Sequence, residues 1–257
     1  MNSQKEQQFA GIIPARYASS RFPGKPLALI GDRSMIQRVC EQALKSLDLV
    51  FVATDDERIL NAVVKFGGKA IMTSTEHSSG TDRCSEAVSK IESITGLQID
   101  VVINIQGDEP FIKPEQIDMI KSCFDDQEVD IATLICKDVT TEDLSNPNQI
   151  KTVITLNGDA LYFSRSAVPY IREFKMTEWI ENHVFYKHLG LYGYKKDILR
   201  KLTTLKRSSL EIAEALEQNR WLENGFKIRT AVSDWDSYGI DSPEDIVKVK
   251  ELFKDLI

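Results

Sequence analysis

The chain of 257 residues contains no long apolar run, and no segment approaches the roughly 20 apolar residues that a membrane-spanning helix needs. Its first eight residues are polar and include no hydrophobic signal region, so we expect a cytoplasmic protein. Neither a Gly-x4-Gly-Lys-Ser/Thr loop nor a Gly-x-Gly-x-x-Gly turn occurs. The two commonest nucleotide-binding signatures are therefore absent.

Paired cysteines and a basic surface are also missing. Cys40, Cys84, Cys123 and Cys136 lie far apart with no Cys-x-x-Cys pair, which favours reduced, buried thiols over a metal site. The net charge of −7 argues against bulk binding of nucleic acid. A chain with 42% apolar and 28% charged residues is typical of a globular protein with a sizeable core.

The first stretch that carries chemistry is an apolar run from residue 9 to 13. It breaks at Pro14 into a loop of small residues with three cations, Arg16, Arg21 and Lys25. The run is too short for a helix and predicts a buried strand followed by a loop. Ligands bind at the carboxyl ends of such strands in open α/β sheets, so the cations are typical of a phosphate-binding loop. A solvated basic loop is the alternative that this stretch leaves open.

The next segments alternate between helix and strand. Apolar periodicity and glycine signals predict helices at 34–47 and 57–66 and strands at 49–53 and 69–72. This order implies right-handed crossovers and an α/β fold with a doubly wound, mostly parallel sheet flanked by helices. The fold class alone does not define a function.

A loop at 73–83 is rich in hydroxyl groups and leads into a helix that Thr81 can cap. Its hydroxyls, backbone amides and Arg83 suit the edge of a pyrimidine, although a plain capped loop would have the same composition. A β-branched strand at 100–105 then runs directly into Gln106 and Gly107. Glycine there lets the backbone approach a ligand.

Two aspartates are candidate metal ligands. Asp108 follows the strand at 100–105, and magnesium usually takes only one or two protein carboxylates. The adjoining Glu109-Pro110 could instead be simple turn chemistry. Asp241 lies immediately before Ser242, which can cap a terminal helix.

The second half predicts a helix at 114–124, a strand at 130–136 and a hairpin. Strands at 151–156 and 160–164 flank Asn157-Gly158-Asp159, a strong hairpin signal. We expect this hairpin to protrude from the parallel sheet as a lid or a dimer contact, and we predict a homodimer.

The remaining elements are an alternating strand at 189–194, a strand at 226–232 and one helix from residue 209 to about Gly225. Ser208 and Glu211 fit a capping box at the start of that helix. Isolated histidines, here His183 and His188, are more often structural than catalytic. The acidic run on the helix is more often a solvated face than a site.

Seven motifs in a fixed order identify a family more specifically than any one motif does. They are residues 14–26, 79–83, 106–110, 162–165, 188–192, 216–218 and 239–245. With them the chain, from about residue 9 to 250, closely resembles the 3-deoxy-manno-octulosonate cytidylyltransferase family. The resemblance implies transfer of CMP from CTP to 3-deoxy-manno-octulosonate (Kdo), giving CMP-Kdo and pyrophosphate for lipopolysaccharide assembly. It also implies one nucleotidyltransferase domain over 1–257. Its parts would be a nucleotide-binding half at 9–136, a hairpin and sugar-binding insertion at 137–194, and a C-terminal part at 195–257.

The resemblance assigns roles residue by residue. It implies that CTP is bound by Ala15, Arg16, Lys25, Ser79, Gly80, Arg83 and Gln106. Magnesium would be bound by Asp108 and Asp241, which together with Arg16 and Lys25 form the catalytic set. The sugar acid would be bound by Arg165, His188, Tyr192, Glu217 and Gln218.

The chain departs from the family pattern at Asn219, where leucine is expected, and over residues 234–238. Arg21 matches the first motif without an assigned role. Two alternatives stay open: activation of another keto sugar acid, such as an amino-Kdo or a sialic acid, and a nucleotide-sugar sensor without turnover. The paired aspartates argue against the sensor, which has no need of a metal site.

Overall fold

The computed structural model describes residues 7–18 and 21–253, which form two compact units. Unit 1 comprises Met1–Asp118, Lys195–Thr203 and Ser237–Ile257, and unit 2 comprises Met119–Tyr194 and Thr204–Asp236. The predicted organisation as one domain stays a prediction. In the described part of the chain, no helix is both long and apolar enough to cross a membrane.

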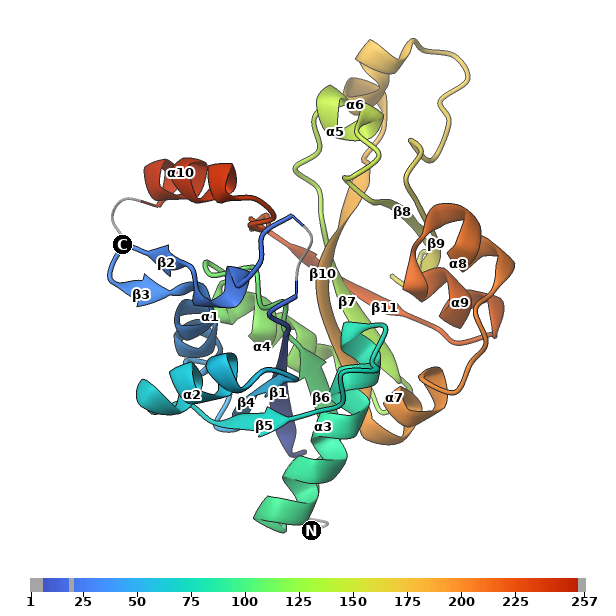
Figure 1. The fold of residues 1–257 in the computed structure, drawn as a ribbon. Coiled ribbons are helices and arrows are strands. Elements are labelled where there is room, and N and C mark those ends of the chain that lie inside the picture. Colours follow the sequence, from blue (N-terminus) through green and yellow to red (C-terminus); the bar gives the residue numbers. More distant parts are fainter. Residues whose placement is uncertain (1–6, 19–20, 254–257) are drawn as a thin grey trace. The chain divides into compact units, whose positions relative to one another are not determined.

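Unit 1 contains a parallel sheet with the strand order β6 (Val101–Asn104), β1 (Phe9–Ala15), β4 (Val50–Thr54) and β5 (Ala70–Met72) (Figure 1). All residues of β4 and β6 are buried, as their unbroken apolar runs predict for strands covered on both faces. β1 continues past Pro14 to Ala15, two residues beyond the predicted end. Its pairing with β6 stops at Ile12, so the missing N–H of Pro14 interrupts no ladder on that side.

Helices connect these strands. The chain passes from β1 through α1 (Met35–Ala43) to β4 and through α2 (Glu57–Lys65) to β5, then returns through α3 (Gly80–Thr95) to β6. Right-handed crossovers therefore place α3 on the face opposite α1 and α2. The predicted α/β class with helices on a mostly parallel sheet is confirmed.

Unit 1 also contains several smaller elements outside the four-stranded sheet and its three connecting helices. They are η1 (Lys25–Leu27), β2 (Leu29–Ile30), β3 (Arg33–Ser34), α7 (Lys196–Leu202) and α10 (Pro243–Leu252). α4 (Pro114–Cys123) contains the point where the chain passes into unit 2.

Two helix starts test the capping predictions. The predicted cap at Thr81 is wrong, because α3 begins at Gly80 and Ser79 accepts a hydrogen bond from the Asp82 amide at 3.1 Å. An N-cap side chain reaches the amide three residues on, and only Ser79 precedes the helix at that spacing. The predicted cap at Ser242 is confirmed, and Asp245 completes a capping box there.

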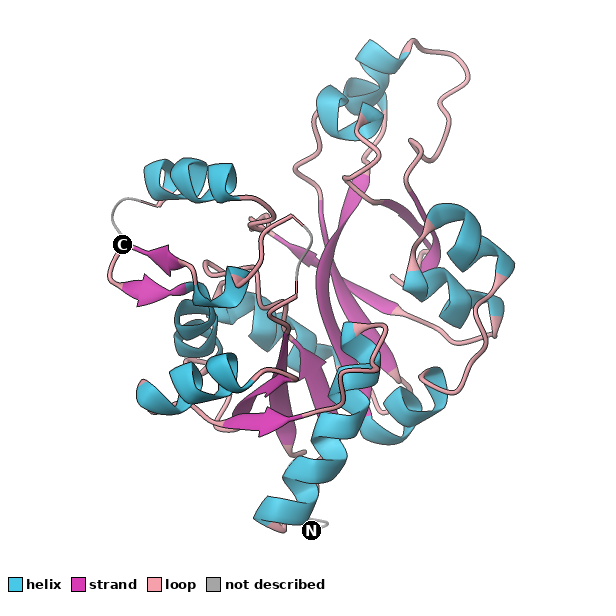
Figure 2. Ribbon diagram, viewed as in Figure 1, coloured by secondary structure: helices cyan, strands magenta, loops and turns pink. Residues whose placement is uncertain are grey.

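Unit 2 is built around β7 (Ile131–Cys136), which pairs in parallel with β11 (Arg229–Ser233) and antiparallel with β10 (Tyr186–Lys195) (Figure 2). The predicted hairpin forms from β8 (Lys151–Ile154) and β9 (Ala160–Ser164). We expected it to stand apart from the sheet, but β8 also pairs antiparallel with β10. Backbone N–H and C=O groups at the start of β10 thereby gain hydrogen-bond partners on β8, so the hairpin extends this sheet.

The helices of unit 2 are short: α5 (Thr141–Ser145), η2 (Met176–Glu178), α6 (Trp179–Asn182), α8 (Ser209–Glu214) and α9 (Glu217–Glu223). The single helix predicted from residue 209 to Gly225 is broken at Ala215, whose φ is 51°. Alanine strongly favours helix and seldom adopts this left-handed conformation, so the local sequence contains no signal for the break.

The four cysteines are free thiols, and three of them are buried. Burial raises the pKa of Cys40 to about 12, which keeps that thiol protonated and unreactive at neutral pH.

Candidate active site

A cavity of about 330 Å³ in unit 1 collects the predicted nucleotide and metal residues. It is lined by Ala15, Arg16, Lys25, Ser79, Gly80, Arg83, Gln106, Asp108 and Asp241. They lie at or after the end of β1, at the start of α3, after β6 and before α10. Strand order reverses at β1, and open α/β sheets bind ligands in the crevice at such a switch point.

Lys25 joins the two candidate metal carboxylates. Its Nζ donates to Asp108 Oδ2 at 2.7 Å and to Asp241 Oδ1 at 3.3 Å. The Ile240 amide donates to the Asp108 carbonyl at 2.9 Å, which brings the segment before α10 against the end of β6. The exposed Arg21 lies 3.2 Å from Asp241 Oδ2. The carboxylates therefore lie close enough to share one cation.

The donor set fits a hard divalent cation. Carboxylate oxygens are its preferred ligands, and magnesium takes its remaining ligands from water and phosphate. The described residues contain no group of three or more His, Cys, Asp and Glu side chains suited to a metal. A site that used only Asp108 and Asp241 would depend on substrate phosphates for completion.

The structure shows a second reason for glycine at position 107, besides the predicted approach of the backbone to a ligand. A Cβ at this position would lie 2.9 Å from the Pro14 carbonyl oxygen, closer than real Cβ contacts. Glycine therefore lets the loop after β6 approach the end of β1, and both line the cavity.

Arg83 is held inside the wall of the cavity. Its side chain is only 5% exposed, and Nη2 donates to Asp55 Oδ2 at 2.6 Å while Nη1 donates to Thr73 Oγ1 at 2.6 Å. Asp55 was not among the predicted site residues. Its position at the carboxyl end of β4 was the available signal.

Glu86 organises the loop before α3. It accepts a hydrogen bond from the Ser74 amide at 2.9 Å and contacts Nε2 of His77, which lines the cavity. Burial acts to raise the pKa of Glu86, but hydrogen bonds from Lys90, Ser74 and His77 outweigh it and lower the pKa to about 2. The carboxylate is therefore ionised at neutral pH. Neither Glu86 nor His77 was predicted, since their pairing depends on how the loop folds back on the helix.

Arg165, predicted for the sugar acid, lies in unit 2 just after β9. Its Nε donates to the Glu214 carbonyl at 2.6 Å, and Nη1 donates to the Pro147 carbonyl at 2.8 Å. Its amide donates to Glu214 Oε2 at 2.8 Å. Backbone and side chain are thus both fixed to the end of α8.

His188 and Tyr192 lie together on β10, with ring centroids 5.2 Å apart. His188 Nε2 lies 3.0 Å from Thr133 Oγ1, and burial lowers the pKa of His188 to about 3. Burial likewise raises the pKa of Tyr192. Both rings are neutral at pH 7 and can provide hydrogen bonds but no charge.

The acidic run of α8 and α9 is not the solvated face that we considered. Glu211 is buried, and Glu214 accepts a hydrogen bond from Ser164 Oγ at 2.8 Å. Glu217 accepts one from Arg220 at 2.7 Å, and the neighbouring Gln218 is buried. The break at Ala215 is the physical reason, because it packs α8 against α9 and turns these side chains inward.

The two departures from the family pattern are accommodated structurally. Asn219 is fully buried, and its amide accepts from Phe163 N at 3.3 Å and donates to Phe163 O at 2.9 Å. In the unusual segment at 234–238, Asp236 accepts a hydrogen bond from the buried Lys187 at 2.6 Å.

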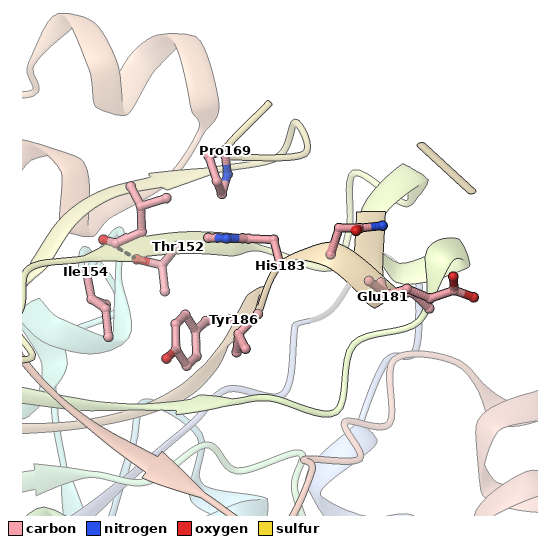
Figure 3. A pocket seen from close by; sticks show the side chains of 10 residues that line it. Thr152, Ile154, Pro169, Glu181, His183 and Tyr186 are labelled. Carbon is pink, nitrogen blue, oxygen red and sulfur yellow. Dashed lines mark hydrogen bonds between the residues drawn. The ribbon is translucent and has the colours of Figure 1, made fainter. Parts of the chain in front are cut away.

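A second cavity, of about 610 Å³, lies within unit 2 between β8, β10 and the residues around α6 (Figure 3). Thr152, Ile154, Glu181, His183 and Tyr186 are among its lining residues (Figure 3). None of the predicted site residues lines it, so its larger volume does not make it the candidate active site.

A switch-point cavity that combines cations with paired carboxylates, on this α/β fold, suits a nucleotidyltransferase. The model of the cytidylyltransferase family matches residues 10–228. The chain belongs to this family, in its 3-deoxy-manno-octulosonate cytidylyltransferase branch, as the similarities below show.

Relatives match nearly the whole chain. The 3-deoxy-manno-octulosonate cytidylyltransferase of Parabacteroides distasonis is 56% identical over 94% of this chain and 96% of its own length. That of Bacteroides thetaiotaomicron is 53% identical over 96% of this chain and 98% of its own length. The solved structure of a CMP:2-keto-3-deoxy-manno-octonic acid synthetase complexed with CTP is 40% identical and matches with a TM-score of 0.89, covering 98% of this chain and 100% of the solved one.

Proposed function

We propose that this chain transfers CMP from CTP to Kdo, giving CMP-Kdo and pyrophosphate for lipopolysaccharide biosynthesis. The observation that carries the proposal is the cavity of unit 1, where the cationic loop, the loop before α3 and two carboxylates share one space. This is the combination that a nucleoside triphosphate and a divalent cation require.

CTP binds in that cavity. Arg16 and Lys25 hold the triphosphate, and the side chains of Ser79, Arg83 and Gln106 face the cytosine and ribose. The amides at the start of α3, a helix of 16 residues, add partial positive charge close to the phosphates. Ala15 and Gly80 leave room for the nucleotide.

Asp108 and Asp241 bind the divalent cation, which we propose to be Mg²⁺. When bound, the cation neutralises charge that develops on the phosphates as pyrophosphate leaves. Lys25, which contacts both carboxylates, keeps them oriented toward the same point and adds positive charge beside the phosphates.

Kdo binds through Arg165, which faces its carboxylate, while His188, Tyr192, Glu217 and Gln218 bind its hydroxyl groups. The anomeric oxygen of Kdo forms a bond to the α-phosphorus, and the bond from that phosphorus to the bridging oxygen breaks. The hydroxyl proton passes to solvent. His188 is a poor acceptor for it, because its pKa of about 3 makes the ring a weak base.

The test measures pyrophosphate release from CTP, Mg²⁺ and Kdo, with amino-Kdo and a sialic acid as competing acceptors. We expect the highest catalytic efficiency with Kdo. Absence of turnover by the folded, metal-supplied protein contradicts the proposal, and a higher efficiency with another acid reassigns the acceptor.

We also propose that the chain forms a homodimer through the β8–β9 hairpin. Leu156 at its turn is fully exposed and Leu161 on β9 is 57% exposed, so the hairpin offers two large apolar side chains that a second copy of the chain would cover. Sedimentation should give twice the mass of the chain, and Leu156→Asp with Leu161→Asp should shift it to the monomer. A monomeric parent protein at micromolar concentration rules the dimer out.

A further inference from the structure

Tyr17 and Arg58, which lie outside the predicted site, stack on one another. The guanidinium carbon of Arg58 lies 3.3 Å from the centroid of the Tyr17 ring. Tyr17 directly follows Arg16 in the cationic loop, whereas Arg58 lies in the first turn of α2. The contact therefore joins the candidate triphosphate loop to the helix that follows β4.

Arg58 is fixed on its other side by Asp56. Asp56 Oδ1 accepts hydrogen bonds from the Arg58 amide and from Nε, both at 2.9 Å, and Oδ2 accepts one from Nη2 at 2.6 Å. Asp56 is also the N-cap of α2. The Arg58 side chain is 60% exposed, so it is not a core residue. Asp56 fixes the orientation in which the guanidinium stacks on Tyr17.

Tyr17 also closes the far end of the same loop. Its carbonyl accepts a hydrogen bond from the Gly24 amide at 2.9 Å. A Cβ on Gly24, whose φ is 71°, would lie 3.0 Å from Cζ of the ring, so the ring covers this residue. Gly24 immediately precedes Lys25. One aromatic side chain thus contacts the loop beside both of its proposed triphosphate-binding cations.

We propose that Arg58 is a positioning residue for CTP: acting through Tyr17, it holds Arg16 and Lys25 in the arrangement that binds the triphosphate. A loop ordered before binding loses less conformational entropy when the ligand arrives, and the affinity rises accordingly. A planar guanidinium suits this task because it can stack on a ring and hold a carboxylate through its fork of donors. The inference rests on the proposed triphosphate role of Arg16 and Lys25.

The experiment measures the dissociation constant of CTP by calorimetry and the KM values for CTP and Kdo. Arg58→Ala should weaken CTP binding about fivefold, the size of an exposed cation–π contact together with lost ordering of the loop. Tyr17→Leu should give at least the same loss, because it also removes the ring from Gly24, and Tyr17→Phe should retain affinity because it keeps the ring. Arg58→Lys should restore part of the affinity, since it keeps the cation without the fork.

The double variant Arg58→Ala with Tyr17→Leu should lose no more affinity than Tyr17→Leu alone, because without the ring Arg58 has nothing to stack on. The KM for Kdo should not change. Arg33→Ala is a matched control: Arg33 is also exposed and pairs with Glu41 at 2.6 Å, outside the cavity. It should leave the CTP affinity unchanged.

Lys25→Ala separates the inference from the proposal beneath it. If Lys25→Ala weakens CTP binding and Arg58→Ala does not, the positioning role is overturned while the triphosphate contact stands. If neither variant weakens binding, both are overturned. A lower unfolding midpoint of Arg58→Ala with unchanged CTP affinity, or additive losses in the double variant, also overturns the positioning role.

Discussion

At the scale of single residues, Lys25 is the point at which the opposite charges of the cavity meet. It contacts Asp108 and Asp241, whose side chains are 32% and 54% exposed. Ion pairs this accessible to water stabilise a fold by only about 0–1 kcal/mol. We therefore expect these ion pairs to matter more for the placement of charge in the proposed reaction than for stability.

Asp108→Asn should lower turnover by several orders of magnitude, because a lost metal ligand removes several kcal/mol of transition-state stabilisation. The free energy of unfolding should change by about 1 kcal/mol or less. Pyrophosphate release and chemical denaturation measure the two effects. Asp125→Asn, at an exposed position outside the cavity, should change neither. Parental turnover in Asp108→Asn would refute the metal role.

Asp55→Asn tests the support of Arg83. The change removes the charge that pairs with a buried guanidinium at 2.6 Å, and hydrogen bonds of this kind contribute about 2 kcal/mol. We expect a loss of that size in the free energy of unfolding and a higher KM for CTP, with the KM for Kdo unchanged. Asp48→Asn, at an exposed surface position, provides the comparison. An unaltered KM for CTP would limit Asp55 to a structural role.

At the scale of elements, the break between α8 and α9 brings the short helices to residues of the proposed sugar site. It brings Glu214 to the backbone of Arg165 and places Asn219 against Phe163 on β9. Among the described strands β9 pairs with β8 alone, so the backbone groups of Phe163 on its other edge need partners from outside a strand. Asn219 therefore supplies hydrogen bonds that the leucine expected from the family pattern cannot make.

Asn219→Leu should lower the free energy of unfolding by about 2 kcal/mol, since it leaves a buried amide and a buried carbonyl of Phe163 unpaired. Denaturant titration followed by fluorescence measures the loss. Asn182→Leu, at an exposed position of α6, should stay within about 0.5 kcal/mol of the parent. An equally small effect at Asn219 would show that packing, and not the two hydrogen bonds, joins α9 to β9.

At the scale of the whole molecule, stability should depend on pH through His188. Its folded pKa of about 3 lies below the ordinary value of 6.5. Below pH 6.5 the unfolded chain takes up a proton that the folded chain does not bind, so the free energy of unfolding decreases as pH falls from 6.5 toward 3. By pH 5 the loss is about 2 kcal/mol. Glu86 adds a further loss between its ordinary value of 4.5 and its folded pKa of about 2.

Tryptophan fluorescence can follow this loss, because all three tryptophans, Trp179, Trp221 and Trp235, lie in unit 2 together with His188. His188→Gln should remove most of the pH dependence between 6.5 and 5. The same slope in the variant and the parent would assign the dependence to other groups.

Local patterns predicted most of the elements. The ends of β4, β5 and α2 fall within one or two residues of the predicted ranges, because apolar periodicity and glycine stops act over a few neighbouring positions. The break at Ala215 and the pairing of β8 with β10 escaped prediction. Both depend on packing between segments that are distant in the sequence.

The candidate site divides in the same way. The family resemblance assigned nine residues to CTP and the metal, and all nine line one cavity in unit 1, although their roles stay a proposal. The partners that hold them, Asp55, Glu86, Tyr17 and Arg58, were not predicted. The sequence gives the residue types and their order directly. It does not give contacts between distant positions, such as those of Lys25 with carboxylates 83 and 216 positions away. Contacts over such separations exist only once the sheet and its loops have brought the partners together.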